Sequence, residues 1–412
     1  MLEYLKLTNV GPAPEMELAF GRRLNIVTGD NGLGKSFLLD VAWWALTRSW
    51  TGFPALPSEG KNAAIQYRGL ERNNETRLVT STFRRSDASW PIDVQCPPVP
   101  GIVIYVRIDG GFSVWDPARN YWRDDPGRPA AYHFAAANVW EGLNIGPERP
   151  CEGLERDWVI WQEGNKPQFK VLESALDVLS PAGEPLRPGP PKRLLIGEGR
   201  DRPTLKIGND IVPVALASAG VRRVLALAYL LVWAWHEHRV SAELLGKPAE
   251  NRVVVLFDEP ETHLHPRWQR TLLPSLLKAL ADLRNNAGAD PQVIVATHSP
   301  LVLASIETHF DSRSDAWFDL DLEHSAIVLR RRAFVRHGDV SNWLTSEAFD
   351  LKEPRSLEAE QAIERAKDLV QQPSPPLAEV ELVDSLLRGV LSDVDRFWVR
   401  WSFFVESVRR RG

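Results

Sequence analysis

The hydrophobic residues of this chain follow two patterns, one typical of strands and one typical of helices. Residues 24–28, 253–257 and 293–296 are nearly continuous apolar runs, as in parallel strands that are buried on both faces of a sheet. Apolar residues at helical spacing predict helices over 36–50 and from 219 to about 238. Shorter apolar segments between turn residues predict further strands at 4–7, 16–20, 63–67, 76–83 and 101–107, and a hairpin over 204–214. Together these elements indicate the α/β class.

The middle of the chain differs from both ends. Residues 51–204 are dense in Gly, Pro and Trp. After residue 107, most of this segment shows no regular hydrophobic pattern, and we expect 181–191 to be a loop. The last 70 residues have a helical pattern with a Pro-rich break at 372–376. We therefore expect a discontinuous core formed by residues 1–50 and 205–335, a strand-rich, Trp-rich insertion lobe over 51–204, and a helical C-terminal region over 336–412.

Composition excludes some classes of protein. The 412 residues are 44% hydrophobic and 25% charged, as in an ordinary soluble protein, and the net charge of −5 gives no global basic field for nucleic acid. The chain does not start with a signal-peptide pattern, its longest apolar run, 224–235, is too short to span a bilayer, and its two cysteines are far apart. A cytoplasmic location without a membrane partner is therefore expected. The chain has sixteen tryptophans, and those within 51–204 either fill the core of the insertion or form an exposed apolar patch on it, which we expect to dock a partner.

One short segment carries the clearest chemical signal. Residues 29–36 have the pattern Gly-x-x-x-x-Gly-Lys-Ser between an apolar run and a predicted helix, which is the setting of a phosphate-binding loop. The glycines let backbone N–H groups face one concavity at a helix N-terminus, which favours anions. Lys35, at an exposed loop tip, is expected to reach the β- and γ-phosphates, and the Ser36 hydroxyl to ligate Mg²⁺. The predicted phosphate-binding residues are Gly29, Asp30, Asn31, Gly32, Leu33, Gly34, Lys35, Ser36 and Phe37.

Two acids follow one of the apolar runs. Residues 253–257 end in Asp258 and Glu259, and a strand would bring Asp258 to the edge of the sheet beside the phosphate loop. There Asp258 can hold Mg²⁺ through water, and Glu259 can polarise an attacking water as a general base. Taken alone, the same pattern also suits a solvated strand end that is capped by acids.

Two further segments carry weaker signals. His298 directly follows the apolar run 293–296 and can contact a γ-phosphate, although a single histidine is more often structural. Ser218, Ala219 and Gly220 open a predicted helix, where they can form another anion site. Simple N-capping by Ser218 also explains this segment.

The order of these segments resembles that of a known family. The phosphate loop, Ser218, Asp258 and His298 follow one another as in an ABC-type ATPase, and the last three are about 40 residues apart. The chain resembles the ABC ATPase superfamily, in particular its SMC, RecF and OLD branch, over about residues 1–50 and 205–335. Asp-Glu-Pro-Glu-Thr-His-Leu-His-Pro at 258–266 and Ala-Thr-His-Ser-Pro at 296–300 are similar to the OLD-like, AAA-type ATPases of bacterial defence and repair systems.

This resemblance implies a fold, cofactors and residue roles. The fold is that of an α/β P-loop NTPase of the ABC-ATPase type, and the cofactors are ATP and Mg²⁺. Ser218 and Gly220 act as the signature motif, which binds the γ-phosphate of ATP held by a second copy, so a homodimer around ATP is implied. Asp258 is the Walker B acid, Glu259 the catalytic acid and His298 the switch histidine.

Some features depart from the family pattern. His265 stands where a transporter ATPase has its D-loop aspartate, as in many OLD-like members. His263 and His265 are two residues apart and no cysteine supports them, so we expect no metal ion there. The Q-loop glutamine stays open, because Gln66 suits it by type whereas the neighbourhood of Asp109 suits it by position.

Three functions remain open. The chain is expected to be an ATP-driven switch for a separately encoded effector, a nuclease, in antiviral defence. It carries no Toprim nuclease of its own, because Asp319-Leu320-Asp321 is followed by a helical pattern. The alternative is a RecF-like or SMC-like repair clamp on DNA, but the net charge argues against it. The third possibility is a scaffold that binds nucleotide without turnover, but Glu259 and His298 argue against that. The dense basic runs, 330–332 with Arg336 and 409–411, are expected to be solvated faces, with DNA as the alternative.

Overall fold

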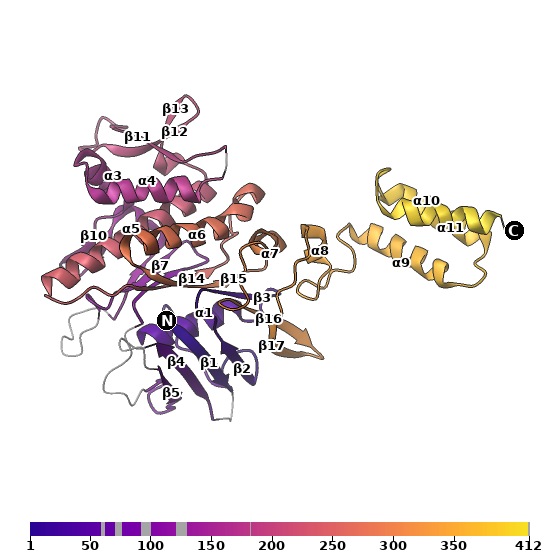
Figure 1. Ribbon diagram of the computed structural model, residues 1–412, viewed down its shortest axis with the longest axis horizontal. Coiled ribbons are helices and arrows are strands. Elements are labelled where there is room, and N and C mark those ends of the chain that lie inside the picture. Colours follow the sequence, from indigo (N-terminus) through magenta and orange to yellow (C-terminus); the bar gives the residue numbers. More distant parts are fainter. Residues whose placement is uncertain (59–61, 71–75, 92–99, 121–129, 182, 411–412) are drawn as a thin grey trace. The chain divides into compact units, whose positions relative to one another are not determined.

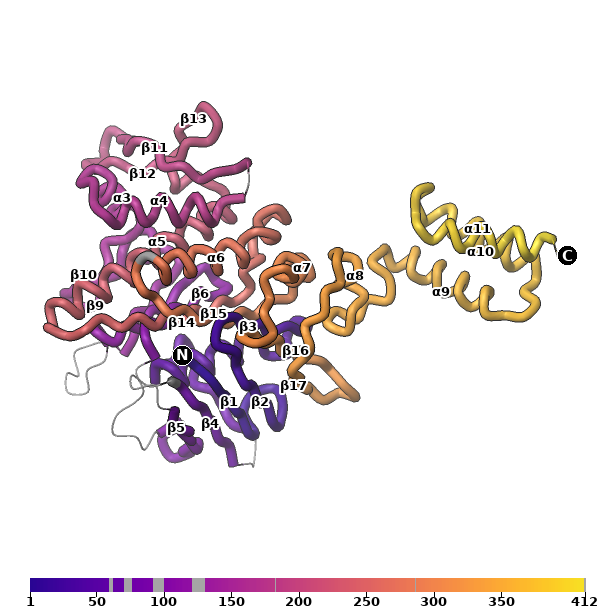
Figure 2. The backbone as a smooth tube through the Cα atoms, in the orientation of Figure 1, coloured from indigo at the N-terminus to yellow at the C-terminus, as the bar shows by residue number. Residues whose placement is uncertain are grey.

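The chain folds into two compact units (Figure 1, Figure 2), which span Met1–Gly338 and Asp339–Gly412. The structure is a computed structural model and describes residues 1–58, 62–70, 76–91, 100–120, 130–181 and 183–410. None of the described helices combines the length and the apolarity that crossing a membrane requires. Each unit is described by itself below.

The larger unit is built on an eight-stranded sheet of order β17-β16-β3-β15-β14-β6-β7-β8. Its five middle strands, from β16 to β6, are parallel, and antiparallel strands extend it at both sides. β3, β6 and β14 are buried along their whole length, as continuous apolar runs predict. The prediction of an α/β fold is confirmed. The strands are β3 (Leu24–Gly29), β6 (Ile102–Val106), β7 (Phe112–Trp115), β8 (Tyr132–Phe134), β14 (Arg252–Asp258), β15 (Asp290–Ala296), β16 (Ala316–Glu323) and β17 (Ala326–Arg332).

Helices cover this sheet on both faces (Figure 1). α1 (Lys35–Thr47) packs against β3, β6, β14 and β15, and shares its hydrophobic core with a second, antiparallel sheet of order β2-β1-β4-β5. α5 (Ala219–Leu244) and α6 (Pro266–Ala287) lie on the other face, where α5 contacts β6 and α6 contacts β15, and α7 (Pro300–Ile306) packs against α6. The second sheet consists of β1 (Leu2–Thr8), β2 (Glu15–Ala19), β4 (Ala64–Leu70) and β5 (Thr76–Thr82).

Residues 51–204, for which we expected one strand-rich lobe, are distributed over three parts of the larger unit. β4 and β5 extend the second sheet through β1, and β6, β7 and β8 belong to the central sheet. The remainder packs beside α5 and α6 (Figure 2). This remainder forms α2 (Ala136–Glu141), β9 (Leu143–Ile145), β10 (Glu148–Cys151), α3 (Leu154–Glu163), α4 (Pro167–Leu179) and β11 (Arg187–Lys192). β11 pairs with β12 (Arg202–Ile207), which pairs with β13 (Asp210–Pro213), and the short helix η1 (Val214–Leu216) leads into α5.

Two segments of this region differ from the sequence prediction. α4 lies in the stretch that we expected to be irregular, although Phe169, Leu172 and Leu176 have helical spacing and are buried. β11 lies largely in the segment that we expected to be a loop, and three of its six residues are prolines. β11 is the edge strand of a three-stranded sheet, so only one side of its backbone pairs with a neighbouring strand. Prolines, which have no N–H group to donate, are tolerated in such a strand.

The tryptophans of this region are core residues wherever the structure describes those that we singled out. Trp115, Trp140 and Trp158 are buried, and Trp122 lies outside the described residues. Trp161 is also buried and packs against Tyr229 of α5, with 5.6 Å between ring centroids. Trp115, Trp140, Trp158 and Trp161 are therefore buried within the larger unit and form no exposed docking patch.

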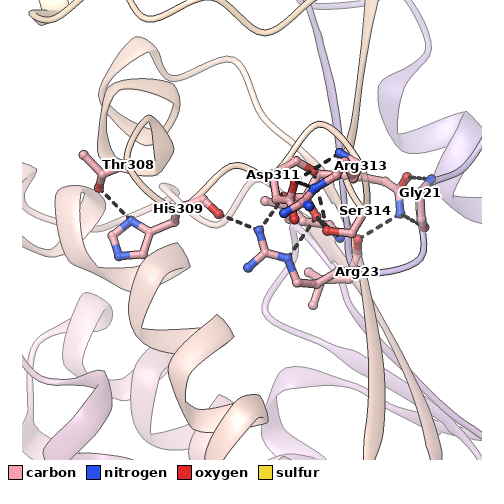
Figure 3. A network of polar contacts seen from close by, with 11 residues as sticks. Gly21, Arg23, Thr308, His309, Asp311, Arg313 and Ser314 are labelled. Atoms are coloured by element: carbon pink, nitrogen blue, oxygen red, sulfur yellow. Dashed lines mark hydrogen bonds and ion pairs between the residues drawn. The ribbon is translucent and has the colours of Figure 1, made fainter.

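A polar network closes the sheet at the amino ends of β3 and β16 (Figure 3). Arg23, just before β3, pairs with Asp315, just before β16, and its Nε lies 2.9 Å from Asp315 Oδ1. Asp315 is 2% exposed and also accepts from the backbone N–H groups of Leu24 (3.2 Å) and Asp311 (2.8 Å). Side-chain and backbone donors thus compensate this buried carboxylate.

The smaller unit is a group of helices with a core of its own. It comprises α8 (Val340–Leu344), α9 (Leu357–Gln371), α10 (Leu377–Val390) and α11 (Phe397–Arg409). Ile363 of α9, Leu387 of α10 and Trp401 of α11 are buried at its centre. These helices lie in the segment for which the sequence predicts a helical C-terminal region.

Candidate functional site

The candidate site lies at the edge of the central sheet where the parallel strands end. β3, β15, β14 and β6 are neighbours in the sheet and run in the same direction, so the segments that follow them emerge at one edge. Those segments are the phosphate loop after β3, Thr297 and His298 after β15, Glu259 after β14, and Arg107 after β6. The fold therefore brings together segments that are far apart in the sequence.

The phosphate loop joins β3 to α1 through three glycines with positive φ angles. Gly29 (φ 137°) and Gly34 (φ 103°) also lie against neighbouring atoms, since a Cβ atom would come within 2.3 Å of the Leu320 carbonyl oxygen and 2.6 Å of Pro12 Cγ, respectively. Gly32 (φ 83°) has open space around it. Only glycine suits the first two positions, as the sequence pattern requires.

The other loop residues divide into exposed and packed side chains. Asp30 and Asn31 are exposed, Leu33 is buried, and Phe37 packs partly buried against the core. Lys35 is only 5% exposed, which corrects the expectation of an exposed loop tip. Its ammonium group donates to the carbonyl oxygens of Gly29 (2.7 Å) and Asp30 (3.0 Å), so it folds back over its own loop.

The charge of the buried Lys35 ammonium group is only partly compensated by its surroundings. Burial lowers the pKa of Lys35, and the nearby carboxylates of Glu259, Glu261 and Asp258 partly oppose this effect. A phosphate group beside the ammonium would add a direct counter-charge. The arrangement therefore suits the role that the motif predicts.

Asp258 ends β14 and lies beside the first turn of α1. It is 2% exposed, and burial raises its pKa to about 6, an effect that a hydrogen bond from Ser36 partly opposes. Within the described part of the chain, its Oδ1 atom has no hydrogen-bond partner. A buried carboxylate oxygen without a donor, next to a hydroxyl group, fits the oxygen ligands that Mg²⁺ prefers. No cluster of three or more His, Cys, Asp or Glu side chains among the described residues is arranged to hold a metal ion, so a magnesium ion would need nucleotide and water oxygens as well.

Glu259 leaves β14 in a strained turn. Its φ is +45°, which is uncommon for a residue with a side chain, and its backbone N–H donates to the Ala296 carbonyl oxygen (2.9 Å). The carboxylate is 16% exposed and its Oε1 lies 3.2 Å from Nδ1 of His298. Thr262 donates to the other oxygen from 3.4 Å. The structure thus brings together the two residues that the sequence singled out as catalytic.

Glu261 is a functional candidate that the sequence reasoning missed. It is 6% exposed, and its Oε1 accepts from the Thr297 hydroxyl (2.8 Å) and the His298 backbone N–H (2.9 Å). The same oxygen lies 3.4 Å from Nδ1 of His298. Glu261 therefore fixes the segment that carries the histidine. It lies within the segment 258–266 that carries the family resemblance, but only the fold reveals its partners.

Arg223 is the second residue that was missed. One guanidinium nitrogen donates to the carbonyl oxygens of Asp258 (3.0 Å) and Glu259 (3.1 Å), and another donates to that of Ile108 (3.3 Å). Burial lowers its pKa, and neighbouring carboxylates, Glu261 first among them, oppose this. Arg223 thus ties the start of α5 to the ends of β14 and β6.

The predicted signature segment lies beside the turn that follows β14. Ser218 caps α5, since its hydroxyl accepts from the Val221 N–H (3.4 Å), and both Ser218 and Ala219 are exposed. Gly220 is buried, and a Cβ atom there would come within 2.8 Å of the His263 carbonyl oxygen. Among the described residues, no hydrogen bond or ion pair joins 218–220 to the phosphate loop of the same chain.

The structure separates the two Q-loop candidates. Gln66 lies in β4 of the second sheet, where its amide donates to Thr80 (3.2 Å). Asp109 follows β6 at the site edge, accepts from the Gly111 N–H (2.8 Å) and lies 3.4 Å from Arg107. The strand order therefore puts Asp109, and not Gln66, in the region where a Q-loop would be.

Comparisons with known proteins agree with this reading over a limited part of the chain. A family model described as "AAA domain, putative AbiEii toxin, Type IV TA system" matches residues 206–304. "Retron Ec83 probable ATPase" of Escherichia coli is 30% identical over 104 residues, which are 25% of this chain and 16% of that protein. "Retron Vc95 probable ATPase" of Vibrio cholerae serotype O1 biovar El Tor is 39% identical over 62 residues, which are 15% of this chain and 10% of that protein.

The curated relatives are matched over no more than about a sixth of their length. Among solved structures, an SMC head bound to the C-winged helix domain of ScpA is similar with a TM-score of 0.45 and 12% identity, over 81% of this chain and 97% of that one. The structure titled "recombination mediator protein RecF-ATP in RecFOR pathway" has a TM-score of 0.37 and 11% identity, over 81% and 97%.

The matched segment 206–304 contains the Ser-x-Gly, Asp-Glu and His segments, and the fold joins them to the phosphate loop at one sheet edge. Over this segment the chain is similar to an AAA-domain family, and over short segments it is similar to proteins named as probable ATPases.

Proposed function

We propose that the chain is an ATP-hydrolysing molecular switch that dimerises around ATP and controls a separately encoded effector, a nuclease, in antiphage defence. The observation that carries the proposal is the convergence of Lys35, Asp258, Glu259 and His298 at one edge of the sheet, with Glu259 3.2 Å from His298. These groups suit phosphate binding, metal ligation, water activation and γ-phosphate sensing, respectively.

The phosphate loop would hold ATP through its backbone and Lys35. On binding, the ammonium group exchanges its bonds to the Gly29 and Asp30 carbonyl oxygens for phosphate oxygens. Ser36 and Asp258 would hold Mg²⁺, which neutralises phosphate charge. Because Asp258 Oδ1 is buried and has no hydrogen-bond partner in the described part of the chain, no described protein donor competes for it.

Glu259 would act as the general base for hydrolysis. It takes a proton from the attacking water, whose oxygen bonds to the γ-phosphorus while the bond to the bridging oxygen breaks, so that ADP and phosphate form. His298 Nδ1 lies 3.2 Å from this carboxylate, and the His298 backbone N–H donates to Glu261. We assign His298 to sensing the γ-phosphate and keeping Glu259 oriented.

The place of the signature segment supports the proposed dimer. Ser218 and Ala219 are exposed at the start of α5 and have no described contact with the phosphate loop of their own chain. Their exposed position suits contact with ATP on a second copy, and two-fold symmetry then creates two equal sites. Asp30, Asn31 and Phe37 of one copy would border the nucleotide, with Ser218 and Gly220 of the other copy facing its γ-phosphate.

The proposed defence role rests on the resemblance of segments 258–266 and 296–300 to the OLD-like ATPases of bacterial defence and repair systems. A nuclease added to the dimer should be active in one nucleotide state and silent in the other. Hydrolysis that is stimulated by gapped DNA without any effector would favour the repair clamp instead.

The test uses Glu259→Gln, which keeps the shape of the side chain and removes the base. Hydrolysis should fall about a thousandfold while ATP still binds. Light scattering should detect a dimer with ATP and Mg²⁺ that is absent or open without nucleotide. Ser218→Arg is the matched control, because it should block closure and leave ATP binding to each copy intact. A Glu259→Gln variant with wild-type turnover would contradict the catalytic assignment, and an unchanged size with ATP would contradict the dimer.

A further inference from the structure

Charge is unevenly distributed in the smaller unit. Residues 396–410 contain four arginines and one acid, Glu406, whereas residues 339–395 contain 13 acids and five basic residues. The basic residues therefore gather on α11 and its start, although the unit as a whole is acidic. Segregation of this kind is a feature of surfaces that meet a charged partner.

The exposed face of α11 combines this charge with apolar side chains. Trp401 and Val405 face the core, and the opposite face carries Val399 and Phe403, each 78% exposed. The exposed residues Arg396, Val399, Arg400, Phe403, Glu406 and Arg410 follow one another at intervals that place them on one side of a helix. A phenylalanine and a valine thus lie between arginines, with nothing in the unit covering them.

The arginines at the start of this face have no acidic partner among the described residues. No ion pair involves Arg396 or Arg400, whereas Arg388 on the neighbouring helix α10 lies 2.9 Å from Asp384. At the end of the face, Arg410 lies 3.9 Å from Glu406, a distance at which an exposed pair contributes little. The positive charge of the face is therefore available to a ligand.

We propose that this face of α11, defined by Arg396, Val399, Arg400, Phe403 and Arg410, binds single-stranded nucleic acid. Arginines along a helix suit phosphate groups, and an exposed aromatic ring between them suits a stacked base. A duplex satisfies the first requirement only, because its bases are stacked on one another and cannot cover Phe403 and Val399. The face extends over roughly 20 Å of helix, enough for a few nucleotides.

This inference is independent of the ATP site. Its residues lie in Asp339–Gly412, a unit with its own hydrophobic core, and none of them belongs to the phosphate loop or to the segments around Asp258 and His298. The charge of the whole chain, −5, gives no indication of it, because the acidic remainder of the unit conceals the basic face.

The experiment measures binding of the full chain to a fluorescent 20-nucleotide oligo-dT, an oligo-rU of the same length and a 20-base-pair duplex, by anisotropy. Both single strands should bind at least about tenfold more tightly than the duplex. Phe403→Ala should weaken binding about tenfold, Phe403→Trp should preserve it, and the double variant Arg396→Ala/Arg400→Ala should lower the slope of log K against log salt by about 1.4.

Arg388→Ala is the matched control, because it removes one exposed arginine from the same unit and should change affinity less than twofold. Far-UV circular dichroism of each variant checks that the helices remain. Equal binding of duplex and single strands, or equal losses for Arg388→Ala and Arg400→Ala, would overturn the proposal. Competition by polyglutamate as strong as by oligo-dT would also overturn it and point to an acidic protein partner. Preference for oligo-dT or for oligo-rU supports it in either case.

Discussion

The two edges of the central sheet share the same strands but are built in opposite ways. At the amino edge, both oxygens of Asp315 have donors, and Gln292 joins Leu2 to Gly21 by hydrogen bonds of 2.8 and 2.9 Å. At the carboxyl edge, Asp258 Oδ1 and Glu261 Oε2 are buried and have no hydrogen-bond partner in the described part of the chain. One edge compensates its buried charges, and the other leaves them for a ligand to compensate.

The backbone differs in the same way. Positive φ angles occur at Gly29, Gly34, Glu259 and His263, all at the carboxyl edge. At the amino edge, Gly101 (φ 97°) before β6 and Gly288 (φ 72°) before β15 also have positive φ angles. The difference therefore concerns residues with side chains: Glu259 and His263 have positive φ angles at the carboxyl edge, and no described residue with a side chain does just before β3, β6, β14, β15 or β16. Strain and unpaired groups cost stability, so they persist where the surrounding fold tolerates them and where they serve binding. The comparison indicates that interactions at the amino edge stabilise the fold and offset the free-energy cost of the unpaired groups at the carboxyl edge.

Lys35→Ala should have the largest effect, and it should be confined to function. The ammonium group is the main cation of the phosphate loop, and two charge-assisted hydrogen bonds to phosphate correspond to about a thousandfold in ATP affinity. Unfolding free energy should change by less than about 1 kcal/mol, because the lost bonds to two loop carbonyl oxygens are offset by removal of a buried charge. Calorimetric titration with ATP and urea unfolding measure the two quantities. Unchanged ATP affinity would contradict the site.

Asp315→Ala should have the reverse effect at the amino edge. It leaves the N–H groups of Leu24 and Asp311 without their acceptor, which should cost about 3 kcal/mol in total, whereas Arg23, 37% exposed, can turn toward solvent. ATP affinity of the folded protein should stay within twofold. Urea unfolding at pH 7.5 gives the stability, and Arg313→Ala on the same turn, where the side chain is exposed, is the control with little expected loss. Equal losses in the two variants would remove the distinction between the edges.

The central strands and the phosphate loop were predictable from the sequence because each depends on local pattern. The runs 253–257 and 293–296 lie within β14 and β15, since continuous apolar residues suit strands buried on both faces. The loop was visible because its glycines and Lys35 are adjacent in sequence. α4 was equally visible in the spacing of Phe169, Leu172 and Leu176, but the surrounding Gly and Pro residues concealed it.

The features that the sequence did not predict depend on contacts between segments that are far apart in the chain. Arg223 is important because its guanidinium reaches the carbonyl oxygens of Asp258 and Ile108, which are 35 and 115 residues away. Nothing in its neighbourhood distinguishes it from Arg222, which lies over the Trp140 ring instead. The assignment of β6–β8 to the central sheet likewise needed strand pairing that no local pattern encodes.

Asp258→Asn should stabilise the protein while it abolishes hydrolysis. The folded pKa of about 6 lies above the ordinary 3.8, so ionisation of Asp258 opposes folding, and this cost grows between about pH 4 and pH 6 and is constant above. The difference between the two pKa values corresponds to about 3 kcal/mol of unfolding free energy. We expect Asp258→Asn to recover about half of it, because burying an amide group also costs free energy. Urea unfolding without nucleotide should therefore give a gain of about 1.5 kcal/mol at pH 7.5 and almost none at pH 4. A loss of stability at pH 7.5 would show that Asp258 is compensated after all.

Glu261→Gln should have the smallest effect and tests how far the unpaired charge at the carboxyl edge matters for function. The glutamine oxygen can still accept from the Thr297 hydroxyl and the His298 N–H, so unfolding free energy should change by less than about 1 kcal/mol. The variant removes the negative charge 3.4 Å from the His298 ring and brings an amide N–H group to the position of Oε2. The ring should be held less firmly, and kcat should fall about fivefold with KM unchanged, because ATP binds through the phosphate loop.

Glu261→Ala is the comparison variant for this last test. It removes the acceptor as well as the charge, leaves the Thr297 hydroxyl and the His298 N–H unpaired, and should cost about 2–3 kcal/mol in stability together with most of the activity. Steady-state kinetics at saturating ATP, with urea unfolding of both variants, separate the two contributions. If Glu261→Gln lost as much activity as Glu261→Ala, the charge itself would be required for catalysis. If neither variant changed kcat, Glu261 would serve the fold alone, and this part of the carboxyl edge would be built like the amino edge.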